Sequence, residues 1–261
     1  LVIDVHAEEG ASAAFLFRLE KGASLSLTWR LTGGDREGTC VLAAYYELAE
    51  DARLHVSRLE SGLTKTVIYD QRHSVLAARA RADFYAAELG GEKIIVHSYG
   101  KLSGDASEMN ERAIYAGRGR QHLDFFYHID HVGKKTKAEI DLKGALADES
   151  KKIFRGTLDF KRGCAGSVGD EGDFAIQLDP KTKNISLPLL LCTEDDVQGN
   201  HASSAGQLDQ NTIYFLMSRG FTLEEARRIV VEALIRPIID GMDEALREEV
   251  LNAVRMKLPS I

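Results

Sequence analysis

The chain has 261 residues, of which 44% are hydrophobic and 28% charged, a composition typical of a globular protein with a sizeable core. Forty acidic residues against 33 basic ones give a net charge of -7, which argues against nucleic acid or an anionic membrane surface as the main partner. No run approaches the roughly 20 apolar residues that span a bilayer. No signal peptide is recognisable, so we expect a cytoplasmic protein, although Leu1 in place of Met leaves a missing leading segment open.

Up to about Ile185, short runs alternate between apolar and polar residues, and Gly, Asp, Lys or Asn separate them. Period-two alternation over four to eight residues predicts half-buried β-strands. The clearest runs are Ser24–Trp29, Arg53–Leu59, Lys93–His97, His122–Tyr127, Lys137–Leu142 and Lys152–Phe160. The sequence therefore predicts a mainly β region.

Polar turn clusters separate these strands at irregular gaps, near fifteen to twenty-five residues in the later part. Gaps of this size favour the coils of a solenoid, in which each turn buries its apolar side against the next. A β-sandwich is the alternative, but the two-residue Asn-Gly or Asp-Gly hairpin turns typical of it are absent from residues 1–206.

Helical patterns begin after Gly206. Asp209 is expected to cap a first helix that runs through Ser218, and Gly220 follows as its left-handed stop. Thr222 to Glu225 form a capping box for a second helix, which Pro237 is expected to end or kink. A third helix is predicted from about Asp243 to Met256. We therefore divide the chain into a β core, 1–206, and a C-terminal helical segment, 207–261.

The junction between the two regions gathers chemically active residues. Cys192, Glu194, Asp195, Asp196 and His201 lie within ten residues of one another. The other two cysteines, Cys40 and Cys164, lie far away, so neither a disulfide framework nor a zinc knuckle is indicated. His128 and His131 flank Asp130, but on a strand they point to opposite faces and are a weak metal pair.

The segment from Val197 to Asp209, followed by Ile213–Gly220 and Glu224–Ala226, resembles the SufB/SufD family of iron-sulfur cluster assembly scaffolds. Asp130–Lys137 and Phe154–Gly156 resemble the same family's solenoid turns. The resemblance implies a right-handed parallel β-helix with a C-terminal helical segment that binds SufC, an ABC ATPase. It further implies a non-catalytic scaffold that pairs with itself or with a SufB-like paralogue.

The same resemblance suggests which residues contact the ATPase. The exposed face of the first two helices supplies them, and we assign Tyr214, Phe215, Arg219, Phe221, Glu225 and Ile229. The chain lacks the Gly-Lys-Ser/Thr phosphate loop, so we expect nucleotide to bind only to the partner. The alternative is that these aromatic residues only cap the open end of the solenoid.

Cluster chemistry is only partly implied. His201 falls where SufD-type members carry a histidine, whereas Gly172 and Gly199 stand where family members carry cysteines. Iron prefers thiolate and accepts imidazole or carboxylate. Cys192 and His201, helped by Glu194 or Asp195, are therefore our candidate ligands for a transient iron-sulfur cluster. With Leu189–Cys192 as the last strand, we expect His201 to lie just before the helices.

Two other interpretations stay open at this point. Cys192 ends an apolar run and can be a core residue, with Glu194–Asp196 a solvated turn. The chain can also be a lyase or hydrolase on a β-solenoid that uses Asp170, Glu171 and Asp173, or Glu194 and Asp195, as acid and base.

Overall fold

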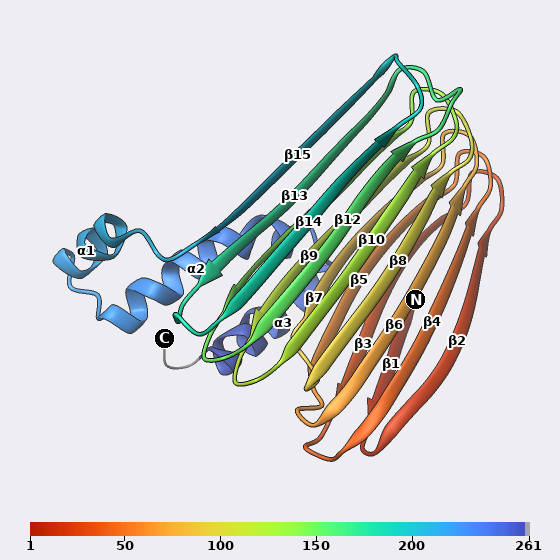
Figure 1. Cartoon of the computed structure of the whole chain (residues 1–261). Helices are drawn as coiled ribbons and strands as arrows, with labels where there is room; N and C mark the ends of the chain where they lie inside the picture. Colours follow the sequence, from red (N-terminus) through yellow and green to blue (C-terminus); the bar gives the residue numbers. More distant parts are fainter. Residues whose placement is uncertain (259–261) are drawn as a thin grey trace.

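Figure 1 shows a computed structural model, which describes residues 1–258 as fifteen strands and three helices. The strands are β1 (Val2–Ala7), β2 (Gly10–Leu19), β3 (Ser24–Gly33), β4 (Gly38–Leu48), β5 (Arg53–Gly62), β6 (Thr66–Leu76), β7 (Arg81–Glu88), β8 (Lys93–Leu102), β9 (Glu108–Gly117), β10 (His122–His131), β11 (Lys137–Leu146), β12 (Lys151–Phe160), β13 (Ser167–Gln177), β14 (Lys183–Cys192) and β15 (Val197–Gly206). The helices are α1 (Gln210–Ser218), α2 (Leu223–Asp240) and α3 (Glu244–Lys257). Every strand predicted from alternation is present.

The strands coil into a parallel β-solenoid of about seven turns. Odd-numbered strands form an eight-stranded sheet in the order β1-β3-β5-β7-β9-β11-β13-β15, and even-numbered strands form a seven-stranded sheet from β14 to β2. All neighbouring strands in both sheets are parallel. The predicted mainly β solenoid is thus confirmed, and the sandwich interpretation is wrong.

One turn of the solenoid is longer than the gaps in the sequence indicate. His122 lies in register with Lys93 on one side and with Lys151 on the other, each 29 residues away. Each turn contributes one strand to each sheet, so successive turn clusters mark half turns and conceal the period. The predicted gap of fifteen to twenty-five residues was therefore not the structural repeat.

A stacked corner repeats along the solenoid. Gly22, Asp51, Arg79, Ala106 and Lys135 all have positive φ, between 55° and 68°. The backbone N–H of each donates to a carbonyl oxygen of the next turn, as from Arg79 to Asp105 and from Ala106 to Lys134. This left-handed conformation is unfavourable for residues with a Cβ. The hydrogen bonds between successive turns offset that cost and hold the corners in place.

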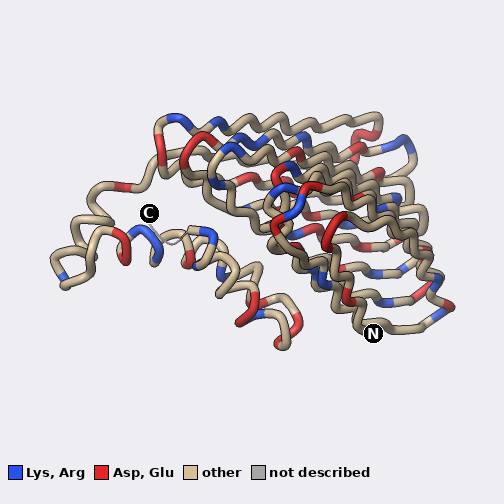
Figure 2. Tube along the Cα trace, turned by 90° about the horizontal axis from the view of Figure 1, so that it is seen from below, with Lys and Arg blue, Asp and Glu red and all other residues tan. Residues whose placement is uncertain are grey.

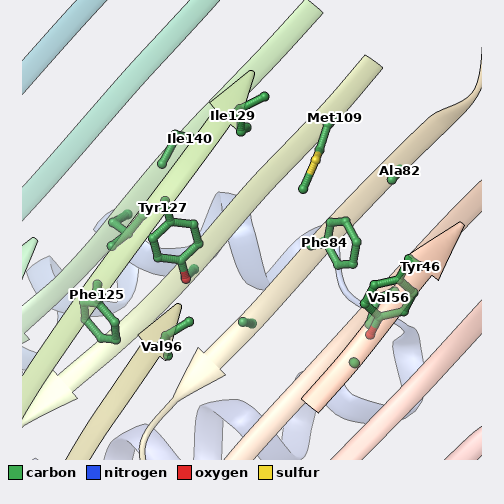
Figure 3. Close-up of a cluster of buried hydrophobic side chains, with 14 of the residues drawn as sticks. Tyr46, Val56, Ala82, Phe84, Val96, Met109, Phe125, Tyr127, Ile129 and Ile140 are labelled. Atoms are coloured by element: carbon green, nitrogen blue, oxygen red, sulfur yellow. The ribbon is translucent and has the colours of Figure 1, made fainter. Parts of the chain in front are cut away.

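The space between the two sheets holds a continuous core. Aromatic side chains from both sheets fill it, including Tyr46, Phe84, Phe125 and Tyr127, and aliphatic side chains such as Val56 pack between them (Figure 3). Tyr46 and Phe84 meet edge to face with ring centroids 5.2 Å apart. Burial of this apolar surface is the main favourable term for folding.

The predicted helix starts and the predicted end of the first helix are confirmed. Asp209 caps α1 by accepting from the N–H groups of Asn211 and Thr212, and Gly220 follows the helix with φ +96°. Thr222 and Glu225 form the predicted capping box of α2. Pro237 does not end α2, which continues to Asp240, because Ile238 and Ile239 are buried on the sheet and hold the last turn.

The helices α2 and α3 cover part of the outer face of the eight-stranded sheet. Ile235, Ile238 and Val250 pack against Ile114 and Ala145, whose side chains point outward from β9 and β11. Figure 1 shows both helices beside the ends of the odd-numbered strands, with α1 farther out. Among residues 1–258 we find no helix of the length and apolar character that bilayer crossing requires.

Candidate functional site

The last turn of the solenoid has no further turn to cover it. Its strands, β14 and β15, are the edge strands of the two sheets. Four aliphatic side chains of β14 point outward and are 40 to 53% exposed: Ile185, Leu187, Leu189 and Leu191. Pro188, in the same strand, has no N–H to donate, which suits an edge position. The last turn is therefore an open and largely apolar end.

Cys192 is the final residue of β14 and its thiol is exposed. Cys40 and Cys164 are buried, and burial raises the pKa of both thiols. A thiol must lose its proton to bind iron or to react. Cys192 is thus the accessible cysteine of the described chain, and the interpretation of Cys192 as a core residue is wrong.

His201 is exposed in the middle of β15, in register with Glu171 of β13. The expectation that Leu189–Cys192 is the last strand is wrong, because the loop after it covers only 193–196 and Val197 already begins β15. The strand continues to Gly206 before the helices begin, so His201 does not lie just before them. Alternation from Val197 to Gly206 was masked by small residues.

The loop between β14 and β15 fixes Glu194. Its carboxylate accepts a hydrogen bond from the backbone N–H of Gly163 at 2.8 Å and another from that of Asp195 at 3.1 Å. These bonds, the first above all, lower the pKa of Glu194. Asp195 is exposed beside it. Glu194 is therefore an ionised carboxylate with part of its hydrogen-bonding capacity already used.

Cys192, His201, Glu194 and Asp195 all belong to the last turn, but they do not form one compact group of ligand atoms. His201 lies four residues into β15, roughly 13 Å along the strand from Val197. Within residues 1–258, the group of three potential ligands within 4.8 Å of one another is instead His128, Asp130 and Asp159. Cluster binding by Cys192 and His201 thus stays a prediction that needs a second chain.

The group around Asp130 has its own cation. Lys161 lies 3.4 Å from Asp130 and also pairs with Asp159, and Tyr99 donates to Asp130. His128 lies on the same outer face, 2.9 Å from Asp130. His131 points into the core, where it stacks on Phe160 at 4.4 Å and burial lowers its pKa to about 4. The opposite orientation of the two histidines is confirmed.

Of the carboxylates of the enzyme alternative, Asp170 does not share a face with Glu171 and Asp173. Asp170 is exposed and accepts from Asn200, whereas Glu171 and Asp173 are buried between the sheets. Asp173 pairs there with Lys152. Alternation along β13 sends Asp170 outward and the other two inward.

The solenoid interior contains charged side chains that sequence analysis missed. Arg58 donates to Asp70 at 2.5 Å, and Arg72 joins Asp70 to Glu88 at 2.6 Å. Farther along, Lys152 pairs with Asp173. All are at most 1% exposed. The alternation of the sequence could have revealed the burial of Arg58, because Arg58 follows Leu54 and Val56 at every second position, on the inward face of β5.

Acids outnumber bases in this interior. Burial raises the pKa of Glu111 and of Glu171 to about 7, and it raises that of Glu60 well above the usual range. Burial thus favours the neutral form of these three carboxyl groups. The other three acids of the interior, Asp70, Glu88 and Asp173, form ion pairs with Arg58, Arg72 and Lys152.

Helix α1 buries little and exposes much. Ile213 is its buried residue and packs against Leu208 and Ala226. Tyr214 is 76% exposed and Phe215 54%. Around them lie further exposed apolar side chains, namely Met217, Phe221 and Leu223. An apolar patch of this kind marks an interaction site in many soluble proteins.

The other residues assigned to ATPase contact lie near this patch. Arg219 stacks over the ring of Phe215, with its guanidinium carbon 5.1 Å from the ring centroid. Glu225 uses its carboxylate in the capping box of α2, so part of its role is structural. Ile229 is half-buried on α2.

A parallel β-solenoid with an open last turn and an exposed helical appendage defines a non-globular repeat architecture suited to binding other proteins. Residues 2–234 match the family described as SUF system FeS cluster assembly, SufBD core domain. The chain therefore belongs to the SufBD family of iron-sulfur cluster assembly proteins, which confirms the resemblance seen in the sequence.

Curated relatives agree with this membership. The chain is 27% identical over 204 residues to the iron-sulfur cluster assembly protein SufD of Bacillus subtilis, covering 78% of this chain and 46% of the relative. It is 26% identical over 216 residues to an iron-sulfur cluster assembly SufBD family protein of Mycobacterium leprae, covering 79% of the chain and 55% of the relative. The SufD of Escherichia coli is 20% identical over 211 residues, 80% of the chain and 50% of the relative. The chain spans about half the length of these relatives.

Proposed function

We propose that this protein is a non-catalytic scaffold subunit of an iron-sulfur cluster assembly complex, working with a SufC-like ABC ATPase. The observation that carries the proposal is the exposed aromatic patch of α1, next to a helix pair that is firmly packed on the solenoid. Within residues 1–258, Tyr214 and Phe215 have no covering element. Aromatic residues in such a position are typical anchors of protein interfaces.

The ATPase contact would be made by α1 and the first turns of α2. Phe215 and Tyr214 would enter an apolar groove of the partner, with Arg219 held over the Phe215 ring. The capping box of Thr222 and Glu225 would keep the two helices at a fixed angle. Movement of the ATPase would then be transmitted through α2, whose second half is buried on the sheet.

The open last turn would pair with a second copy or with a SufB-like paralogue. Ile185, Leu187, Leu189 and Leu191 offer an apolar strip, and β15 adds an edge of free backbone groups. Pairing would bring Cys192 and His201 next to the same residues, or their equivalents, of the partner. A transient iron-sulfur cluster is the cargo that this thiol and imidazole set suits, since few ligands permit release.

Co-purification with a SufC-like ATPase tests the ATPase contact. Phe215→Asp is expected to abolish the complex, because it places a carboxylate in an apolar contact. Met256→Asp is the matched control: Met256 is 78% exposed on α3, away from the patch, and its replacement is expected to leave the complex intact. Retention of the complex by Phe215→Asp would refute the assigned contact.

Anaerobic reconstitution with iron and sulfide tests the cargo. A complex with its paired subunit is expected to develop thiolate-to-iron absorption, which Cys192→Ser diminishes. Cys40→Ser provides the control, because the buried Cys40 cannot reach an external cluster. Equal absorption from wild type and Cys192→Ser would exclude the proposed ligand.

A further inference from the structure

A row of basic residues runs across the seven-stranded sheet at the end nearest the helices. The first residues of β8, β10, β12 and β14 are Lys93, His122, Lys151 and Lys183. They are paired in register, Lys93 with His122, His122 with Lys151 and Lys151 with Lys183. We call these four residues the basic row. Their side chains point to the outer face of the sheet, which leaves them half-exposed or exposed.

The direct pairing of Lys151 with Lys183 is unfavourable for folding. Neighbouring strands are about 4.8 Å apart, and like charges directly opposite each other destabilise a sheet. In the described part of the chain, Lys93, Lys151 and Lys183 form no ion pair. The nearby carboxylate of Glu149 is instead shared by Arg120 and Lys181. The chain itself therefore does not neutralise the basic row.

The surface is hollowed along the row. A depression of about 430 Å³ is lined by five basic or imidazole side chains and one carboxylate, namely Arg120, His122, Lys151, Lys181, Lys183 and Glu149. Figure 2 shows Lys and Arg recurring on successive turns of a chain in which acidic residues are more numerous overall. A concentrated positive hollow on a chain of net charge -7 favours an acidic ligand.

A second row lies two residues farther along each strand. It consists of Ile95, Asp124, Ile153 and Ile185, again in register on the outer face. We call it the aliphatic row after its three isoleucines; its fourth residue, Asp124, is a carboxylate that pairs with Arg155. The two rows are roughly 6.6 Å apart, twice the rise per residue of a strand. Ile185 is 45% exposed. A basic stripe therefore runs parallel to a mostly apolar stripe.

We propose that the basic row and the aliphatic row together bind an amphipathic helix of a protein partner, one that carries a stripe of Asp or Glu beside a stripe of aliphatic residues. Side chains at positions i and i+4 of a helix are about 5–6 Å apart, close to the spacing of the strands. A helix about 10 Å wide covers both rows. Four strands, about 14 Å across, match nearly three helical turns.

The aliphatic row decides between possible acidic ligands. A nucleic-acid backbone would pair with the lysines but would leave Ile153 and Ile185 without an apolar partner, and the overall negative charge of the chain would oppose its approach. An amphipathic helix satisfies both rows at once. This surface is also distinct from the proposed ATPase contact, since α2 and α3 pack on the other sheet and α1 extends beyond the solenoid.

Binding of a synthetic peptide tests the proposal. The probe is a fluorescein-labelled helical peptide of about 14 residues, roughly 21 Å long, with Glu at every third or fourth position beside a Leu stripe. Fluorescence anisotropy at low salt is expected to show saturable binding. A scrambled peptide of the same composition is expected to bind at least roughly tenfold more weakly, because it loses the spacing of the charges.

Charge reversal locates the site. Lys151→Glu with Lys183→Glu is expected to weaken peptide binding at least roughly tenfold. The double variant should stay folded by circular dichroism, since it replaces one directly opposed pair of like charges by another at positions that are not buried. The matched control is Lys134→Glu with Lys137→Glu, at the opposite end of the strands, which should bind as wild type does.

The outcomes are decisive in both directions. Absence of peptide binding, equal binding of the scrambled peptide, or unchanged binding by the Lys151 and Lys183 variant would overturn the proposal. Tighter binding of a single-stranded oligonucleotide than of the helical peptide would also overturn it. Since α1 is untouched, these results are independent of whether an ATPase binds there.

Discussion

The middle turns and the last turn of the solenoid use similar residues in opposite ways. In the middle turns, charged side chains such as Arg72 and Asp173 are buried between the sheets and paired. In the last turn, aliphatic side chains such as Leu187 face solvent, and the thiol of Cys192 is accessible. The first region is complete within one chain, whereas the second offers surface that only another molecule can cover.

This difference separates stability from assembly. A repeat protein gains stability from contacts between neighbouring turns, so the middle turns hold the fold and the last turn contributes less to it. Substitutions in the middle turns should accordingly lower the free energy of unfolding, whereas substitutions in the last turn should weaken association with another molecule. The following experiments test that separation, beginning with the largest expected effect.

Asp173→Asn should give the largest loss of stability. It leaves the Lys152 amine buried and without its partner, which costs about 3–5 kcal/mol. Urea denaturation measures the effect. Asp170→Asn, three residues earlier but exposed, is the control and should change the free energy of unfolding by about 0.5 kcal/mol or less. Similar losses for the two variants would contradict the division between interior and surface.

A matched pair of leucines gives the next effect. Leu158 of β12 is fully buried, and Leu187 of the adjacent β14 is 53% exposed. Leu158→Ala should cost about 2–5 kcal/mol, and Leu187→Ala about 0.5 kcal/mol or less. In contrast, Leu187→Asp should weaken self-association or pairing in analytical ultracentrifugation. A large loss of monomer stability from Leu187→Ala would show that the last turn is part of the core.

The buried carboxyl groups predict a pH effect. The pKa of Glu111 is raised to about 7 by burial, above the roughly 4.3 of an unfolded chain. The stabilisation from its protonated form is therefore fully present below the unfolded value and is lost as pH rises through about 7. Relative to Glu111→Gln, wild type should lose stability between about pH 4 and 7, by on the order of 1.4 kcal/mol per unit of pKa shift.

The comparison with Glu111→Gln removes an opposing contribution. His131 has its pKa lowered to about 4 by burial, so its contribution to stability rises with pH over part of the same interval. Because His131 is present in both proteins, its effect cancels in the difference. A difference in unfolding free energy that does not change with pH would refute the raised pKa of Glu111.

Thiol alkylation should separate the two regions without affecting stability. Cys192 should react with iodoacetamide in the folded protein, whereas Cys40 and Cys164 should react only after unfolding, because both are buried. Mass spectrometry of the digested protein identifies the modified residues. Pairing through the last turn should also protect Cys192. Rapid labelling of Cys164 in the folded chain would contradict this assignment.

The sequence predicted the strands and helices well because their signals are local. Alternation located runs such as Lys152–Phe160, and the capping residues Asp209 and Thr222 located the helix starts. The length of one solenoid turn was not predicted, because each turn contains two corners and the polar clusters in the sequence therefore mark half turns. β15 was missed because small and polar residues, Gly199 to Gly206, conceal its alternation.

The candidate site was only partly predictable. Cys192, Tyr214 and Phe215 are exposed, as a role in binding requires, but contacts across a subunit boundary depend on a second surface that one sequence does not contain. The buried charges escaped notice for another reason. Arg58 and Arg72 occupy positions of β5 and β6 that alternate with the outward-facing residues. Their interior location can be predicted only if the position along the strand is given more weight than the charge of the side chain.

The stacked corners at Asp51, Arg79, Ala106 and Lys135 have a consequence for how this architecture changes length. Each corner meets the next through the same backbone bond, so the junction does not depend on which side chains occupy it. We expect that excision or duplication of a stretch equal to one complete coil would leave equivalent junctions on both sides. The length of the solenoid in related proteins should then vary in steps of one coil, while the C-terminal helices remain packed on the same sheet.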